Sequence, residues 1–173
     1  NALKEISQFT PKPTESKVLR LGIIGGASHM KDLELLDGVV KQLSPDVLNK
    51  VQFVLCGFDK GYMYNSQGER VEIPWKDNQW TQVEKMLTDN YKTISHAHKE
   101  FLEKFEWQLE FNSDEPYKRI WTKDIFQYAT AYNEIDVLLV PLLANDFTAC
   151  KSELKLIEAS VMKKPVIISD VPP

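Results

Sequence analysis

This sequence has few cysteines, no long apolar run and no excess of basic residues. Its two cysteines, Cys56 and Cys150, have no CxxC spacing and no histidine pair beside them, which argues against a disulfide framework or a zinc site. No stretch approaches the ~20 consecutive apolar residues that a membrane-spanning helix requires. The 21 Lys and Arg residues are outnumbered by 25 Asp and Glu residues, so the charge pattern of a nucleic-acid-binding protein is absent as well. We therefore expect no metal, no nucleic-acid partner and no membrane-spanning segment.

What remains is an ordinary globular composition. The 173 residues are 43% hydrophobic and 27% charged, which suits one domain with a sizeable core. We interpret residues 1–2 as the remnant of a cleaved tag, residues 3–16 as a linker or domain entrance, and residues 17–173 as the domain itself. Because the sequence stops at Pro172 and Pro173, shortly after the last apolar run, we expect the domain to be truncated at its carboxyl end. Reduced cysteines are typical of a cytoplasmic protein, while membrane association of a longer parent stays open.

Short, nearly continuous apolar runs predict strands that are buried on both faces of a parallel sheet. These runs are residues 18–24, 51–56, 135–140 and 165–168. Amphipathic spacing predicts helices between them, over residues 31–43, 123–132 and 152–162. The apolar positions at helical spacing are Leu33, Leu36, Val40 and Leu43 in the first helix, Ile125, Tyr128 and Ala129 facing inward in the second, and Leu154, Ile157 and Val161 along one side of the third. Strand, helix and strand in succession form a βαβ unit. The sequence thus predicts an α/β, Rossmann-like domain, an open and mostly parallel sheet with helices on both faces.

An insertion is expected around residues 60–115. Residues 59–78 suggest a turn or hairpin, and the charged stretch 80–107 suggests one long amphipathic helix or two, before a short strand near residue 117. The aromatic side chains of this region suit packing of the insertion onto the domain better than a carbohydrate platform. They are Tyr62, Tyr64, Trp75 and Trp80.

The first candidate site is the turn that runs from Gly25 and Gly26 to Lys31. Ligands of doubly wound sheets bind beyond the carboxyl ends of the strands, and small residues let backbone N–H groups approach an anion there. His29 and Lys31 could add donors. A tight strand-to-helix turn without a ligand is the alternative. A nicotinamide-dependent dehydrogenase, with Asp59 on the ribose, is disfavoured because the glycines do not match G-x-G-x-x-G.

The second candidate site is the loop and helix from residue 145 to residue 158. Ser152 is placed to cap the helix, and Lys151 and Lys155 near its first turn would suit a diphosphate. Lys155 and Glu158 are three residues apart and share a helix face, so Glu158 could accept hydrogen bonds from sugar hydroxyls. An ordinary capped surface helix with a Lys–Glu pair is the alternative.

The order of these residues resembles a known family. Pro141 and Leu142 are followed by Asn145 and Phe147, then by Lys151, Ser152, Lys155 and Glu158, and then by the run from Lys164 to Asp170. This arrangement resembles the donor-binding end of group 1 glycosyltransferases of GT-B architecture. The resemblance covers most of the chain outside residues 60–115, and its specific part is residues 135–170.

The resemblance implies roles for individual residues. Glu158 looks like the second glutamate of the Glu-x7-Glu motif, which binds the ribose of the nucleotide. Cys150 occupies the position of the first glutamate, so the group that holds the donor sugar is left open. Family members usually place a basic pair near the first strand on the diphosphate. Here His29 and Lys31 are the nearest candidates, and the expected arginine is missing.

By this resemblance, the chain would be the nucleotide-sugar-binding half of a transferase. A sugar would move from a UDP- or GDP-sugar to a saccharide or lipid-linked acceptor in carbohydrate or polysaccharide biosynthesis. The reaction would retain anomeric configuration and need neither metal nor cofactor. The acceptor would be bound by an N-terminal domain absent from this chain, so the fragment alone is expected to be inactive. The alternative, favoured by Cys150, is a non-catalytic nucleotide- or carbohydrate-binding module that has lost transferase chemistry.

Overall fold

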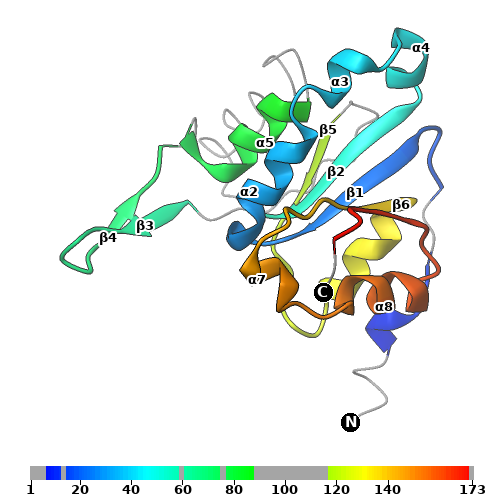
Figure 1. Ribbon diagram of the computed structural model, residues 1–173. Coiled ribbons are helices and arrows are strands. Elements are labelled where there is room, and N and C mark those ends of the chain that lie inside the picture. The colour runs from blue at the N-terminus through cyan, green and yellow to red at the C-terminus, as the bar shows by residue number, and fades with distance from the viewer. Residues whose placement is uncertain (1–6, 13–14, 59–60, 75–76, 88–116, 172–173) are drawn as a thin grey trace, which may run out of the picture.

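The centre of the molecule is a parallel sheet. The computed structural model describes residues 7–12, 15–58, 61–74, 77–87 and 117–171 (Figure 1). Five parallel strands pair in the order β5-β2-β1-β6-β7. They are β1 (Leu19–Gly25), β2 (Val51–Gly57), β5 (Tyr117–Ile120), β6 (Val137–Val140) and β7 (Val166–Ile168). Counted along the chain this order is 3-2-1-4-5, that of doubly wound nucleotide-binding folds, so the prediction of an α/β Rossmann-like fold is confirmed.

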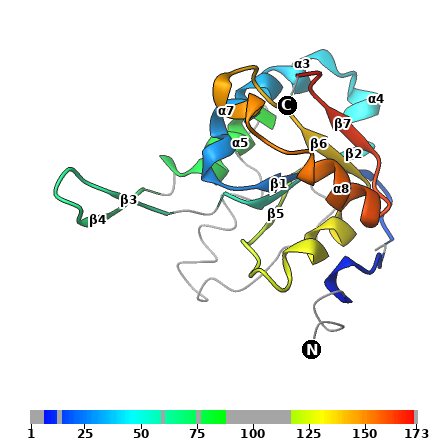
Figure 2. The same ribbon diagram turned by 60° about the horizontal axis from the view of Figure 1, so that its bottom comes forward.

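Helices cover both faces of this sheet (Figures 1 and 2). On one face, α2 (Met30–Leu33), α3 (Val39–Gln42) and α5 (Gln79–Leu87) pack against side chains such as Phe53 and Leu55 of β2. On the other face, the 3₁₀ helix η5 (Tyr128–Glu134) and α8 (Leu154–Val161) pack against Val54 and Cys56. Alternate side chains of β2 therefore enter two different cores, which explains why its whole sequence is apolar or buried.

The helix predicted over residues 31–43 is interrupted. The chain forms η2 (Ala27–His29), α2, η3 (Glu34–Leu36), α3 and then α4 (Pro45–Leu48). The break falls at Gly38, whose φ of 75° is left-handed and ends a right-handed helix. The predicted apolar positions nonetheless face the core, because Leu33 and Val40 are buried there and Leu36 packs against them.

The helix predicted over residues 123–132 begins later than expected. Asp124 accepts hydrogen bonds through its side chain from the N–H of Phe126 and through its carbonyl from that of Tyr128. This turn precedes η5, and it leaves Ile125 73% exposed, so the prediction that Ile125 faces inward is wrong. Ala129, predicted to face inward, is fully buried.

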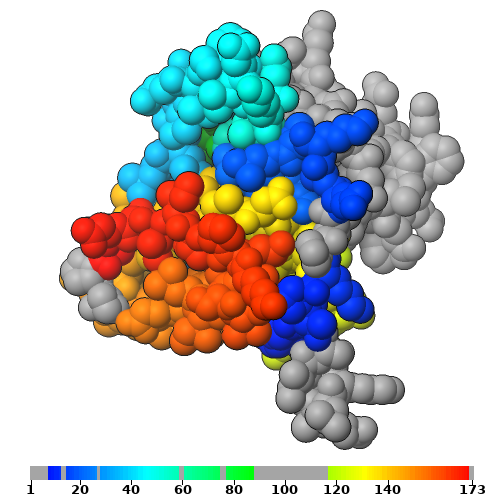
Figure 3. Space-filling view, turned by 90° about the vertical axis from the view of Figure 1, so that its right-hand side faces the viewer, coloured from blue at the N-terminus to red at the C-terminus, as the bar shows by residue number. Residues whose placement is uncertain are grey.

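The last helix is shorter than predicted and differently oriented. A separate short helix, α7 (Asp146–Ala149), forms inside the predicted loop, and α8 begins at Leu154. Ser152 does not cap α8, since its N-cap is Glu153 without a side-chain bond. Leu154, Ile157 and Val161, the apolar residues predicted to line one side of the helix, are all about half exposed. Figure 3 shows the face of the molecule on which the segment of α8 (orange) lies beside that of β7 (red).

The insertion after β2 is partly described. The predicted hairpin is confirmed as β3 (Tyr62–Tyr64) paired antiparallel with β4 (Arg70–Glu72), and it projects from the body of the domain (Figures 1 and 2). Trp80 packs as predicted, buried in the core with its indole N–H donating to the Gly57 carbonyl oxygen, whereas Tyr64 is 62% exposed on the hairpin. Trp75, Asp59 and residues 88–116 of the predicted long helices lie outside the described residues.

The amino-terminal segment predicted as a linker contains the short 3₁₀ helix η1 (Ser7–Phe9). The ring of Phe9 meets the ring of Tyr128 edge to face, with 5.8 Å between centroids. Among the described helices, none has the length and apolar character that crossing a bilayer requires.

Candidate functional site

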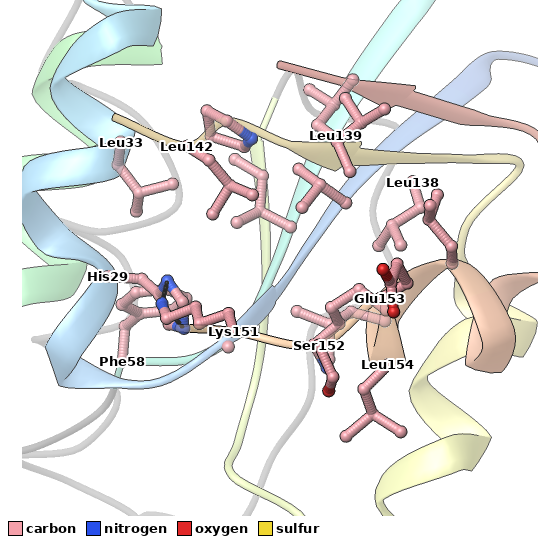
Figure 4. A pocket seen from close by; sticks show the side chains of 18 of the residues that line it. His29, Leu33, Phe58, Leu138, Leu139, Leu142, Lys151, Ser152, Glu153 and Leu154 are labelled. Carbon is pink, nitrogen blue, oxygen red and sulfur yellow. Dashed lines mark hydrogen bonds between the residues drawn. The ribbon is translucent and has the colours of Figure 1, made fainter. Parts of the chain in front are cut away.

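A cavity of about 430 Å³ opens at the carboxyl ends of the strands. It lies where β1 and β6 are neighbours, the point at which the strand order reverses and where doubly wound folds bind their ligands. Its wall is mostly apolar and includes Leu33, Phe58, Leu138, Leu142, Leu154 and Ile168. Its polar lining is His29, Cys150, Lys151, Ser152, Glu153 and Lys155. Figure 4 shows His29, Phe58 and Lys151 on one side of this cavity and Ser152, Glu153 and Leu154 on the other.

The cavity brings together half of the predicted site residues. Gly25, His29, Lys151, Ser152 and Lys155 line it, so the two candidate sites meet at one place although they are more than 100 residues apart. The other predicted residues are not part of its wall. They are Gly26, Lys31, Asn145, Phe147 and Glu158, of which Lys31 is exposed and Glu158 is buried behind Lys155.

Glycine is required where β1 and β2 end. Gly57 has a φ of 86°, and a Cβ there would collide with the carbonyl oxygen of Gly25. The next residue, Phe58, also has a positive φ of 65°. Its ring lies 3.1 Å from where a Cβ of Gly25 would stand, and it forms part of the cavity wall. The ends of β1 and β2 can thus approach each other closely because Gly25 and Gly57 have no Cβ.

His29 is held by Asp32, a residue that the sequence does not single out. The Nδ1 atom of His29 lies 2.9 Å from Oδ2 of Asp32, which is only 6% exposed. The other carboxylate oxygen of Asp32 accepts a hydrogen bond of 3.0 Å from the backbone N–H of Leu143, beyond β6. Asp32 thereby ties the β1 side of the cavity to the β6 side. The i, i+3 spacing of His29 and Asp32 is the only sequence signal for this pair.

Lys151 bridges the two sides from the opposite direction. Its Nζ atom lies 3.3 and 3.4 Å from the two ring nitrogens of His29 and 4.4 Å from the ring centroid of Phe147. The loop that carries Lys151 is shaped by Asn145, whose side chain accepts a 2.9 Å hydrogen bond from the N–H of Thr148 and caps α7. Asn145 therefore positions the loop, and the ligand contact expected of it stays a prediction.

Glu158 is the centre of a buried polar cluster. It is 5% exposed and accepts hydrogen bonds from the hydroxyl groups of Tyr128 (2.9 Å) and Tyr132 (2.7 Å) and from Nζ of Lys155 (3.0 Å). Burial, together with the hydrogen bond to Glu158 and its charge, raises the pKa of Tyr128 to about 12 and raises that of Tyr132 as well. Oε1 of Glu158 therefore accepts from Tyr128, and Oε2 accepts from Tyr132 and Lys155. Lys155 is the member of this cluster that lines the cavity.

The two cysteines form no disulfide; Cys56 is buried and Cys150 is exposed at the cavity. Within the described part of the chain, no group of three or more His, Cys, Asp and Glu side chains is arranged to hold a metal ion. The chain matches no family model, no curated protein and no solved structure.

Proposed function

We propose that this chain binds a nucleoside-diphosphate sugar, such as a UDP- or GDP-sugar, and is the donor-binding domain of a retaining, metal-independent glycosyltransferase. The observation that carries the proposal is the cavity at the β1–β6 switch point, which combines an apolar wall with His29, Lys151 and Lys155. The acceptor, a saccharide or a lipid-linked saccharide, would be bound by a domain outside this chain. Transfer then requires both parts.

The two kinds of lining match the two halves of such a ligand. The apolar side chains suit the flat faces of a base or a sugar ring, and the amino groups of Lys151 and Lys155 suit the diphosphate. The first turn of α8 also borders the cavity, and the positive end of its dipole favours an anion there. In glycosyl transfer the nucleoside diphosphate departs with developing negative charge, which preorganised cations and amides stabilise.

Glu158 contributes to this proposal through Lys155. An ammonium group has three donors, and the 3.0 Å bond to Glu158 takes one of them, leaving the others for a ligand. Because Glu158 is itself held by Tyr128 and Tyr132, it fixes the direction in which Lys155 points. A direct bond from Glu158 to a ribose, as the family resemblance implies, would have to replace one of these donors.

Ligand-induced stabilisation tests the proposal. UDP, GDP, ADP and NAD are each added to the wild-type chain and to Lys151→Gln and Lys155→Gln, and unfolding is followed by calorimetry. A nucleotide at ~100 times its dissociation constant raises the free energy of unfolding by about 2.7 kcal/mol. Loss of one charged hydrogen bond of about 1.5–3 kcal/mol would weaken binding roughly 10- to 100-fold.

Lys50→Gln is the matched control, because this exposed lysine precedes β2, at the amino end of that strand, whereas the cavity lies at the carboxyl ends of the strands. We expect one of UDP and GDP to stabilise the wild type and the control equally and both cavity variants less. If NAD alone stabilises the chain, or if the two cavity variants bind like the control, the proposal is wrong.

A second candidate function is nucleotide or carbohydrate binding without transfer. It is favoured by Cys150 at the cavity, where the family resemblance calls for a glutamate, and by the enclosure of Glu158. Joining the chain to the acceptor domain of its parent distinguishes the two. Sugar transfer by the joined protein supports the transferase, and tight nucleotide binding without transfer supports the binding module.

A further inference from the structure

The cluster of Asp32, His29 and Lys151 places an imidazole between a carboxylate and an ammonium group at the cavity. His29 contacts Asp32 of α2 at 2.9 Å and Lys151 of the α7–α8 connection at 3.3 Å. Strand β1 and the residue after β2 contribute Ile23, Ile24, Gly25 and Phe58 to the cavity wall, and none of these residues is titratable. Lys155, Glu153 and Cys150 are the other titratable groups of the cavity wall.

Asp32 determines which nitrogen of His29 carries a proton. A carboxylate accepts hydrogen bonds and does not donate them, so the 2.9 Å contact requires a proton on Nδ1. The neutral ring then has its lone pair on Nε2, on the side away from Asp32. Asp32 is 6% exposed and is also held by the Leu143 N–H, so it is fixed in place and orients the ring as a positioning residue.

Lys151 lies over this ring. Its Nζ atom is almost equally far from both ring nitrogens, 3.3 and 3.4 Å, so it is not in line with either lone pair. Its other aromatic neighbour is Phe147, whose ring centroid lies 4.4 Å from Nζ and whose side chain is 61% exposed. The ammonium group is therefore held by contacts at the cavity surface, which a bound anion can replace.

We propose that the cavity binds a phosphate-bearing anion together with a proton. The inference rests on the proposed function, and it adds that the diphosphate is bound by Lys151 and by a His29 that becomes protonated on Nε2. As the anion draws the ammonium group of Lys151 to itself, negative charge replaces positive charge beside His29. The ring then takes one proton from solvent and donates it as a hydrogen bond to the anion, while Asp32 stabilises the imidazolium through Nδ1.

Titration calorimetry measures this coupling directly. UDP, GDP and inorganic pyrophosphate are titrated into the chain near pH ~7.5 in buffers of different ionisation enthalpy, which gives the number of protons taken up on binding. We expect an uptake approaching one proton, and an affinity that falls by up to about tenfold for each unit by which the pH is raised. His29→Gln removes this uptake and leaves only the protonation of the ligand itself. Lys50→Gln, at the amino end of β2 and away from the cavity, should behave as the wild type.

Asp32→Asn separates a positioning role from a purely structural one. Long-range nitrogen–proton NMR of the His29 ring in the unliganded chain should show the Nδ1–H tautomer, and Asp32→Asn should abolish this preference and reduce the proton uptake. A variant that lowers only the melting temperature, with tautomer and uptake unchanged, would overturn the role of Asp32.

The outcomes for the two proposals differ. Nucleotide binding without proton uptake overturns the coupling and leaves the proposed function standing. Proton-linked binding of pyrophosphate, with no preference for UDP or GDP, upholds the coupling and removes the nucleotide-sugar function. Binding of none of the three probes overturns both.

Discussion

Replacing Glu158 tests the central polar cluster of the second helical layer. Glu158→Ala leaves the hydroxyl groups of Tyr128 and Tyr132 without their acceptor and opens a gap at a position that is 5% exposed. Breaking a buried, hydrogen-bonded charge cluster typically costs about 3–5 kcal/mol. Lys155 adds little to this figure because its side chain is 35% exposed and can turn to water. For a domain of this size the loss corresponds to a melting temperature lower by roughly 6–20 °C.

Calorimetry and urea unfolding of Glu158→Ala and of three further variants measure the effect. Glu158→Gln keeps the volume and one acceptor, so we expect a loss of about 1–2 kcal/mol, and Tyr132→Phe removes one bond to a charged acceptor at about 1.5–3 kcal/mol. Glu34→Ala, at an exposed glutamate of η3, is the control and should change the stability by less than about 0.5 kcal/mol. If Glu158→Ala costs no more than this control, the cluster does not stabilise the fold.

The same cluster predicts an alkaline limit to stability. Burial, with Glu158 as the second cause, raises the pKa of Tyr128 to about 12, above the value of about 10 in an unfolded chain. Because the neutral hydroxyl is favoured in the folded state, this contribution is complete below pH ~10 and is lost as the pH rises toward ~12. In Glu158→Gln this contribution should be smaller, and its loss should be complete at a lower pH. A stability that is flat across this range would contradict the assignment.

Three further predictions concern the frame of the cavity. Gly57→Ala should lower the free energy of unfolding by more than about 1 kcal/mol and reduce nucleotide affinity, because a Cβ at its positive φ collides with the Gly25 carbonyl oxygen. Calorimetry measures the first effect and ligand titration the second, and an unchanged affinity would count against this role of Gly57. Burial disfavours the charged form of Asp136, but hydrogen bonds from Arg20 prevail and lower the pKa of its carboxyl. Its contribution to the free energy of unfolding is therefore present above pH ~4 and lost below that pH. Asp136→Asn should remove this acid-dependent part of the urea midpoint, and an unaltered acid profile would refute the pairing. Asn145→Ala should cost about 1 kcal/mol through loss of the α7 cap, with Asn145→Asp nearly neutral in the same unfolding assay, and equal losses in both would argue against capping.

The strands could be predicted because their burial is written in short apolar runs. The segment around Phe53–Cys56 is buried on both faces, and its continuous hydrophobicity reflects that environment. The lateral order of the strands is not encoded in such runs. It depends on contacts between distant segments, such as the pairing of β1 with β6.

The helices were predicted less well because single residues override periodicity. Gly38 adopts a left-handed conformation and divides one expected helix, and Asp124 forms a turn that delays another. In α8 the apolar residues that share one side of the helix are about half exposed, and the buried side includes Glu158. A charged residue can occupy that side because two tyrosines from η5 satisfy it, which no pattern within the helix reveals.

The candidate site divides in the same way. His29, Lys151 and Lys155 were predicted from their chemistry after a strand or at a helix start, and they line one cavity. Asp32 and Tyr132 were not predicted, because each acts through a partner that the fold supplies. Asp32 reaches Leu143, 111 residues away, and Tyr132 reaches Glu158, 26 residues away.

The junction between β1 and β6 also has a consequence for folding. Arg20 at this junction bonds to Asp136, 116 residues later, whereas β1 and β2 are joined by a short connection. Closing a loop of that length costs about 1.2 kcal/mol more entropy than closing one of ~30 residues, so this pairing is expected to be a late step. The cavity has one wall on each side of the junction. Ligand binding should therefore appear with the slowest refolding phase, after β1 and β2 have paired.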